Sequence, residues 1–414
     1  MSVAVGVGGV VVMGIKRTGA GVVVAAGAIA LTAAVFSSVP AAAGPTLSPD
    51  APTAIPSPVS TGLPIGPSAD DTSSGTVQCE FKESGDFYTV YGVFAQGDSV
   101  YAATWGDGLG ISTDGGQTYT MVTNKTKRVK TNEFRGVYAQ GDNIYAIGQS
   151  RIYMSSNGGG KWNTNLIGAS PNSVFAQGDT VYMGTTRYPR ISTKGTKNKG
   201  WKKKTKGIPS KGKYNLAVFA EGETVYVTGT SNSKSPGALF VSTNGGDNWT
   251  PKTASDGLPS ATSDVFAQGD TVYVTPNTDT ITSVTPPYIS TDAGNSFSPL
   301  GPASFWNDVV GGTYKNSVFA QGDMIYVATY VGVAISADGG QSFELSSVTT
   351  PGQFSNRVYD VFAVGETVYA ATADGLFIGT CTTGTVPVAS AMVPAAGGVA
   401  GGSPAAIRGR ISIW

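Results

Sequence analysis

Short apolar runs, separated by turns rich in glycine, fill the chain between about residue 77 and residue 381. Runs of this length bounded by turn residues are typical of β-strands. One phrase, Val-Phe-Ala-Gln-Gly-Asp, recurs with small changes throughout this part of the chain. Its seven copies begin at Val93, Val137, Val174, Val218, Val265, Val318 and Val361. Successive copies start 37 to 53 residues apart, which indicates one structural unit built seven times.

Each unit has the same four strands in outline. The first strand ends at the Gln-Gly-Asp turn, and a second strand, such as residues 180–183, follows it. A third strand, such as residues 332–335, runs into a glycine-rich turn, after which an aromatic residue opens the fourth. No segment after the N-terminal apolar region has a convincing helical period. The sequence therefore predicts an all-β protein, a seven-bladed β-propeller of four-stranded blades, with a six-bladed ring as the alternative.

The seventh unit, residues 358–381, stops after its third strand. Residues 76–81, just before the first repeat, are the obvious source of the missing strand, and their pairing would close the ring without a free edge. Cys79 and Cys381 are the only cysteines of the chain, and this pairing places them on neighbouring strands. A Cys79–Cys381 disulfide is the prediction, and two unpaired thiols are the alternative.

The turn before the fourth strand follows a second pattern, Ser/Thr-x-Asp-x-Gly-x-Ser/Thr-aromatic. Three copies fit it fully, two carry asparagine in place of aspartate, and a sixth, over residues 192–201, is degenerate. The acidic or amide position is held by Asp114, Asn157, Asn244, Asp292 and Asp338. A short carboxylate or amide can accept hydrogen bonds from backbone N–H groups two residues further on, and glycine supplies the positive φ of the turn.

These turns resemble the boxes of the Asp-box (BNR-repeat) β-propellers, a superfamily that includes sialidases, sortilin-type receptors and photosystem II assembly factors. The resemblance covers residues 77–381. In that superfamily the box is a structural turn that lies away from the binding face. The resemblance therefore implies that the five box residues serve folding and not catalysis.

The two ends of the chain differ from the repeats in composition. Residues 1–43 are typical of an export signal, with Lys16 and Arg17 before an apolar run and alanines at 41–43 for cleavage. An uncleaved membrane anchor is the alternative, and Met13 is an alternative start. Residues 44–75 are expected to form a disordered linker, and residues 382–414 a Gly/Ala/Pro-rich tail. We therefore expect a secreted or cell-envelope protein with no membrane span in the mature chain.

The overall composition limits the chemistry. The chain has 27 basic and 27 acidic residues and no histidine. The absence of histidine excludes a Ser-His-Asp triad, a Cys-His dyad and histidine-ligated zinc. We expect neither a metal nor a cofactor.

The candidate ligand site lies opposite the turns that repeat. The Gln-Gly-Asp turn and the box both follow odd-numbered strands, so they share one face, whereas the loops on the other face vary between units. Variable loops on a rigid scaffold commonly carry function. The candidates on this loop face and at the channel mouth are Tyr91, Trp105, Asp107, Arg135, Arg187, Arg190, Asp264, Tyr359 and Asp360, with Trp306 and Tyr330 as further loop residues. A solvated channel lining without a ligand is the alternative.

The resemblance does not extend to the residues that sialidases use. A sialidase needs three arginines, a tyrosine nucleophile with a glutamate base, and an aspartate acid, and places an Arg-Ile-Pro motif near the start of the propeller. That motif is missing here, and nothing in the spacing of the candidates requires those roles. We predict a non-catalytic propeller that binds a protein or glycan through its loop face; a sialidase-like glycoside hydrolase is the alternative.

One stretch of the chain is strongly basic. Residues 187–213 contain two arginines and nine lysines and no acidic residue. Lys202, Lys203 and Lys204 at its centre are candidates for binding an anionic polymer, and a solvated lysine loop is the alternative. Nucleic acid is the least expected partner because of the export signal.

Overall fold

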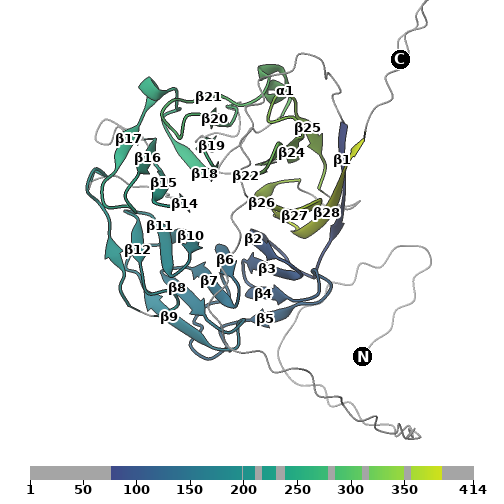
Figure 1. Cartoon of the computed structure of the whole chain (residues 1–414). Coiled ribbons are helices and arrows are strands. Elements are labelled where there is room, and N and C mark those ends of the chain that lie inside the picture. The colour runs from purple at the N-terminus through teal and green to yellow at the C-terminus, as the bar shows by residue number, and fades with distance from the viewer. Residues whose placement is uncertain are drawn as a thin grey trace, which may run out of the picture. The chain divides into compact units, whose positions relative to one another are not determined.

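The structure is a computed structural model that describes residues 76–197, 199–209, 217–229, 238–277, 285–309, 317–348 and 356–384, all within one compact unit. The predicted signal peptide and linker, and the tail beyond residue 384, lie outside these residues. Seven four-stranded antiparallel sheets form a ring around a central channel (Figure 1). The predicted all-β, seven-bladed propeller is thereby confirmed, and the six-bladed alternative is wrong.

Six blades are consecutive four-stranded meanders. Blade 1 contains β2 (Val90–Gln96), β3 (Ser99–Thr104), β4 (Leu109–Ser112) and β5 (Thr120–Val122). Blade 2 contains β6 (Gly136–Gln140), β7 (Asn143–Gly148), β8 (Arg151–Ser155) and β9 (Trp162–Leu166). Blade 3 contains β10 (Pro171–Gln177), β11 (Thr180–Thr185), β12 (Arg190–Ser192) and β13 (Lys202–Lys203). Blade 4 contains β14 (Val218–Glu221), β15 (Thr224–Thr228), β16 (Leu239–Ser242) and β17 (Thr250–Lys252). Blade 5 contains β18 (Thr262–Gln268), β19 (Thr271–Pro276), β20 (Tyr288–Ser290) and β21 (Ser298–Pro299). Blade 6 contains β22 (Val318–Gln321), β23 (Met324–Thr329), β24 (Gly332–Ser336) and β25 (Glu344–Ser346).

Blade 7 joins the two ends of the repeat region. It contains β26 (Val358–Val364), β27 (Thr367–Thr372) and β28 (Gly375–Gly384), and its outer strand is β1 (Thr76–Glu83). β1 pairs antiparallel with β28 and places Cys79 opposite Cys381, and the two cysteines form a disulfide. The predicted closure by the N-terminal strand and the predicted disulfide are both confirmed.

The hydrophobic core is divided among the contacts between neighbouring blades. The alanine of the repeated phrase is buried in all seven copies, at no more than 3 % exposure. The box aromatic packs against the preceding blade: Trp162 of blade 2, for example, lies in one cluster with Tyr101 and Ile111 of blade 1. The same arrangement across blades 7 and 1 packs Tyr119, the box aromatic of blade 1, against the cluster that contains Tyr369 of blade 7. The ring is therefore stabilised by the faces between blades, which explains why each unit keeps the same apolar positions.

The first residue of the Gln-Gly-Asp turn bonds to the next blade in five of the seven copies. The Oε1 of Gln96 accepts a hydrogen bond of 2.7 Å from the backbone N–H of Gly141 in the next blade's turn. Four further copies make the same contact at 2.9 to 3.1 Å, through Gln177, Glu221, Gln268 and Gln321. The last residue of the turn also contacts the box of its own blade, since the backbone carbonyl of Asp98 accepts from the N–H of Gly115 at 2.8 Å. The two repeated motifs therefore lie on one face and bond to each other.

The boxes fold as tight hydrogen-bonded turns. Asp114 Oδ1 accepts from the backbone N–H groups of Gln117 and Thr118 at 3.0 and 2.9 Å, three and four residues further on. The bond two residues on is made instead by Ser112, whose Oγ accepts from the N–H of Asp114. The hydroxyl groups of Ser112 and Thr118 also donate to the Asp114 carboxylate, and these two bonds lower the pKa of Asp114 most. Asp292 is held in the same way.

In the described part of the chain, two short helices depart from the expected all-strand pattern. α1 (Ala303–Asp308) precedes blade 6, and a 3-10 helix (Ala254–Asp256) precedes blade 5. Trp306 on α1 is 1 % exposed, and its Nε1 donates to the carbonyl of Leu300 at 2.6 Å. The sequence interpretation of Trp306 as a loop-face ligand residue is therefore wrong, because this side chain closes the core beneath blade 6. A six-residue helix is too short to show a helical period in the sequence.

Candidate functional site

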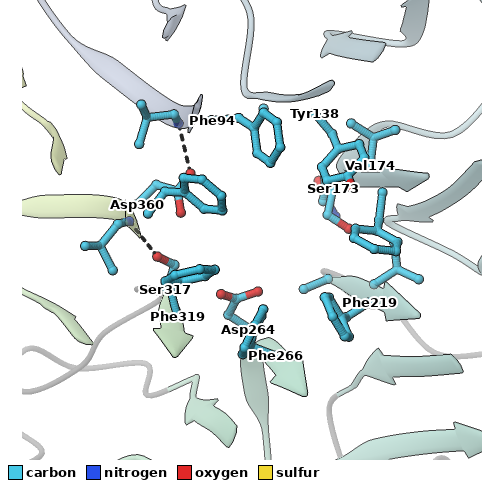
Figure 2. Close-up of a pocket in the computed structure, with 18 of the residues that line it drawn as sticks. Phe94, Tyr138, Ser173, Val174, Phe219, Asp264, Phe266, Ser317, Phe319 and Asp360 are labelled. Carbon is cyan, nitrogen blue, oxygen red and sulfur yellow. Dashed lines mark hydrogen bonds between the residues drawn. The ribbon is translucent and has the colours of Figure 1, made fainter. Parts of the chain in front are cut away.

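The central channel forms a cavity with a volume of about 550 Å³. The innermost strand of every blade contributes to its lining, including Phe94, Tyr138, Phe219, Asp264 and Asp360, whose side chains point into the channel in Figure 2. The channel wall is organised in layers. From the loop face inward these are an aromatic and arginine mouth, a polar layer and a closed ring of aromatic side chains.

The aromatic ring of the channel is built from the second residue of the repeated phrase. Its members, named the collar, are Phe94, Tyr138, Phe175, Phe219, Phe266, Phe319 and Phe362. Every neighbouring pair around the channel is in contact, with ring centroids 4.6 to 4.9 Å apart and interplanar angles of 42 to 53°. Seven such contacts form a continuous aromatic surface that leaves each side chain partly exposed to the channel.

The collar limits what can pass through the channel. A regular heptagon with sides of 4.6 to 4.9 Å is about 11 Å across between ring centroids. Allowing for the van der Waals thickness of the rings leaves an opening of at most about 7 Å. An α-helix needs about 10 Å, so a helix cannot thread the collar, whereas an extended side chain fits.

The polar layer lies one step nearer the loop face, at the residue before the repeated valine. Asp360 Oδ2 accepts from the backbone N–H of Val93 at 2.9 Å, and Asp264 Oδ2 accepts from that of Val318 at 3.1 Å. Ser317 Oγ does the same for Val361 at 2.8 Å. In each case the side chain of one blade holds the backbone of the next, and Figure 2 marks the bonds of Asp360 and Ser317.

A backbone irregularity turns these side chains toward the channel. Strands β2, β10, β18 and β26 each shift register just before the repeated valine, as between Thr262 and Asp264 in β18. An extra residue in a strand re-aims the side chains beside it. The shift therefore allows both Tyr359 and Asp360, which are consecutive, to line the cavity.

The two channel carboxylates lie in a setting that disfavours their charge. Burial raises the pKa of Asp264 to about 7, and the negative charge of Asp360 contributes to this rise. Burial also raises the pKa of Asp360 to about 6, against the backbone and Ser317 hydrogen bonds that lower it. An aspartate whose pKa is raised binds more protons in the folded than in the unfolded state.

We expect the free energy of unfolding to fall as pH rises from 5 through about 7, because Asp264 and Asp360 lose their protons over that interval only in the folded state. The lowered pKa of Asp114 acts in the opposite direction and below about pH 4, so the two effects are separable. Urea unfolding at pH 5, 6, 7 and 8 measures the slope. The double variant Asp264→Asn with Asp360→Asn should flatten it, and an unchanged slope in that variant would contradict the assignment.

A cluster of aromatic and arginine side chains lies at the channel mouth on the loop face. Its members, named the mouth cluster, are Tyr91, Trp105, Arg135, Tyr330, Arg357 and Tyr359. Three of the rings form a row in space with Tyr91 in the middle. The centroid of the Tyr91 ring lies 5.7 Å from that of Trp105 and 4.9 Å from that of Tyr359. The cluster draws on blades 1, 2, 6 and 7, so it forms only when the ring is closed.

The two arginines lie over rings of this cluster. The guanidinium carbon of Arg135 is 5.9 Å from the Trp105 ring centroid. That of Arg357 lies between two rings, 4.4 Å from the Tyr330 centroid and 4.5 Å from the Tyr359 centroid. Cations over aromatic faces are stabilised by the ring quadrupole, more strongly where water is excluded. Trp105 remains 43 % exposed, so its ring is available to a ligand.

The structure separates the other candidates from this cluster. Asp107 lies beside Trp105, but its Oδ2 accepts from the backbone N–H of Tyr88 at 3.1 Å. Arg187 and Arg190 lie on blade 3, which is not adjacent to blade 7, and the Nη2 of Arg190 donates to the carbonyl of Ile167 at 2.7 Å. Lys202 and Lys203 form the outer strand of blade 3, and Lys204 forms an ion pair with Asp247. Of the basic candidates, Arg135 therefore lies at the channel, whereas Arg187, Arg190 and the three lysines do not line the central cavity.

The sequence interpretation missed two parts of the functional surface. The collar was overlooked, although an aromatic residue at the second position of all seven phrases is a visible signal. Arg357 was not among the ligand candidates, because its place between Tyr330 and Tyr359 depends on how blades 6 and 7 pack. Within the described ranges, no group of three or more acidic or cysteine side chains is placed to hold a metal ion. In the same ranges, no helix is long and apolar enough to cross a membrane.

Comparisons with known proteins agree on the architecture. No family model and no curated protein matches the chain. Among solved structures, YCF48 bound to D1 peptide is 16 % identical with a TM-score of 0.53, over 73 % of this chain and 96 % of that one. YCF48 from Cyanidioschyzon merolae gives the same identity and TM-score over 72 % and 98 %. An ancestral GH74 enzyme is 16 % identical with a TM-score of 0.54, over 73 % of this chain and 46 % of that one. At these identities the likeness establishes the fold alone.

Proposed function

We propose that this chain is a non-catalytic binding protein, exported to the cell surface or the surrounding medium, that holds a segment of a partner protein at the mouth of its channel. The observation that carries the proposal is the mouth cluster. Tryptophan, tyrosine and arginine are the side chains that most often dominate the binding energy of protein interfaces. Here Trp105, Tyr91 and Arg135 lie together on the variable face, at the entrance to a cavity.

The rigidity of the cluster favours this role. Each ring is held by a neighbour, so little side-chain freedom is lost when a ligand binds. The collar below accepts an extended side chain but excludes a helix, which suits an extended segment that inserts one residue. YCF48, which shares the fold, has been solved with a peptide bound. A glycan stacked on Trp105 is the alternative ligand of the same surface.

The channel chemistry favours binding over hydrolysis. A tyrosine nucleophile needs a lowered pKa, but burial raises the pKa of Tyr359, against the lowering effect of Arg357. In the described part of the chain only Arg357 lies over Tyr359, whereas a sialidase-like site would gather three arginines. Asp264 and Asp360 are each occupied by a backbone N–H of the next blade.

The test is to replace Trp105 by alanine. We expect the affinity for the partner, or for the best glycan on an array, to fall at least about tenfold, as for a central interface tryptophan. Tyr88→Ala is the matched control, because Tyr88 is an aromatic residue on the same face, is 82 % exposed, and has no ring contact among the described residues. Equal losses in the two variants would contradict the proposal. So would turnover of fluorogenic glycosides that disappears in Asp360→Asn.

A further inference from the structure

The charge of this neutral chain is divided between the two halves of the ring. Between Gly136 and Ala217, which covers blades 2 and 3, there are thirteen basic residues and two acidic residues. Between Val218 and Gly384, which covers blades 4 to 6 and the three inner strands of blade 7, there are four basic and fifteen acidic residues. A neutral total therefore conceals one strongly basic sector.

Most of the described basic side chains of this sector are exposed, on the outer strand of blade 3 and in its box turn above all. Lys202 and Lys203 are exposed on β13, the outer strand of blade 3, and Lys194, Lys197 and Lys199 are exposed in the box turn before it. Among the described residues of this stretch, Lys204 is the lysine that has a carboxylate partner, Asp247. The remaining charges are left uncompensated, so they add to one positive field.

The basic residues of blade 1 continue this surface. The loop after β5 carries four exposed basic residues, Lys125, Lys127, Arg128 and Lys130. Arg128 Nη1 donates to Asn163 Oδ1 on the outer strand of blade 2 at 2.8 Å, and Asn163 Nδ2 donates to the carbonyl of Thr196 in the box of blade 3 at 3.5 Å. Asn163 therefore joins two segments that are 60 to 70 residues apart in the sequence.

These contacts define a continuous basic rim. Its exposed members are Lys125, Lys127, Arg128, Lys130, Lys161, Lys194, Lys197, Lys199, Lys202, Lys203 and Lys206. Lys127, Arg128 and Lys161 line a hollow of about 310 Å³ against Trp162 between blades 1 and 2. The rim spans three of the seven blades, or about 150° of the ring.

We propose that the basic rim binds a flexible linear polyanion that wraps along the outside of blades 1 to 3. The shape of the rim favours a chain over a lipid surface, because a flat membrane touches a curved edge at one place, whereas a flexible chain follows it. Most residues of the rim are lysines. The lysine ammonium is a point charge and lacks the planar guanidinium with which arginine forms bidentate pairs, so it imposes little geometric preference on the anionic group. Polymers that carry phosphate groups and polymers that carry carboxylate groups are therefore both suitable ligands of the rim.

The rim offers little to a nucleic acid beyond its charge. Binding of single strands relies on aromatic rings that stack with bases. The rings nearest the rim are not free for this: Trp162 is 3 % exposed, Trp201 is half-buried, and Tyr188 is covered by Lys203, whose Nζ lies 4.7 Å from the ring centroid. We therefore expect no preference for RNA over a polyphosphate of equal charge.

The test measures binding of the full chain to fluorescently labelled long-chain polyphosphate and to a polyuronate between 50 and 200 mM NaCl. With four or more contacts, the affinity for either chain should fall at least about tenfold over that range. Similar affinities would indicate recognition of charge alone, and binding of only one chain would identify the anionic group; both support the proposal. An affinity independent of salt would overturn it, as would tighter binding to a single-stranded RNA or to anionic phosphatidylglycerol vesicles of equal charge.

Charge-reversal variants locate the site. Lys127→Glu and Lys202→Glu lie at opposite ends of the rim, and each should weaken binding to long-chain polyphosphate at least threefold. Lys82→Glu is the matched control, since Lys82 is exposed on β1, the outer strand of blade 7, outside the rim. Equal losses in all three variants would overturn the proposal. Trp105→Ala should leave polyanion binding unchanged, so the rim and the mouth cluster can fail independently.

Discussion

Replacing both Cys79 and Cys381 by serine is expected to lower the free energy of unfolding by about 5 kcal/mol, near the upper end for a single disulfide. The two cysteines are 302 residues apart, so the bond restricts almost the whole repeat region in the unfolded chain. The entropy that this loop removes grows with its length. In the folded state the same bond fastens β1, the one strand of the ring that comes from the other end of the sequence.

The measurement is guanidinium unfolding of the oxidised wild type and of the double serine variant. The wild type treated with a reductant should unfold at the same denaturant concentration as the variant, and the variant should not respond to the reductant. Loss of the bond should also expose β28 as an edge strand, which favours aggregation. An unfolding midpoint that is unchanged by the double substitution would show that the pairing of β1 with β28 holds the ring without the bond.

The number of blades and the closure could be predicted from the sequence because the ring is made of local units. Each copy of the repeated phrase specifies its own strand and turn, and the copies differ little. The missing fourth strand of the last unit left one place for β1, and the two cysteines agreed with it. Local pattern and global topology point to the same arrangement here, as expected for a repeat fold.

The channel lining could not be predicted in the same way. The sequence placed Tyr359 and Asp360 among the channel-mouth candidates, but no residue type predicts the register shift in β26 that lets both of them line the cavity. The Asp360 carboxylate also accepts a hydrogen bond from the backbone of Val93. This contact joins the last blade to the first, between residues 267 positions apart in the sequence. The mouth cluster predicted from the sequence was incomplete for the same reason, since it lacked Arg357. A single sequence shows which residues a unit carries and the order of the units, but not how the side chains of neighbouring units meet.

The second large effect is expected at the box aromatics. Trp249 of blade 4 is 5 % exposed and lies in one cluster with Tyr182 and Ile191 of blade 3. We expect Trp249→Ala to lower the free energy of unfolding by about 3 to 5 kcal/mol, because it leaves a cavity between two blades. The neighbouring backbone cannot collapse freely into that space, since the carbonyl of Lys206 accepts from the N–H of Trp249 at 2.9 Å.

Two further variants, Trp249→Phe and Trp201→Ala, test whether the loss of packing between blades explains this cost. Trp249→Phe should cost less than about 1.5 kcal/mol, because Phe297 and Phe343 fill the same position in blades 5 and 6. The buried Nε1 of Trp249 also has no hydrogen-bond partner among the described residues, so no such bond is lost. Trp201→Ala in the degenerate box should cost less than Trp249→Ala, since Trp201 is only half-buried. Urea unfolding of the three variants gives the order. If Trp201→Ala cost as much free energy of unfolding as Trp249→Ala, the degenerate box would pack as tightly as the regular ones. The lysines of that box would then add charge to the surface without weakening the fold.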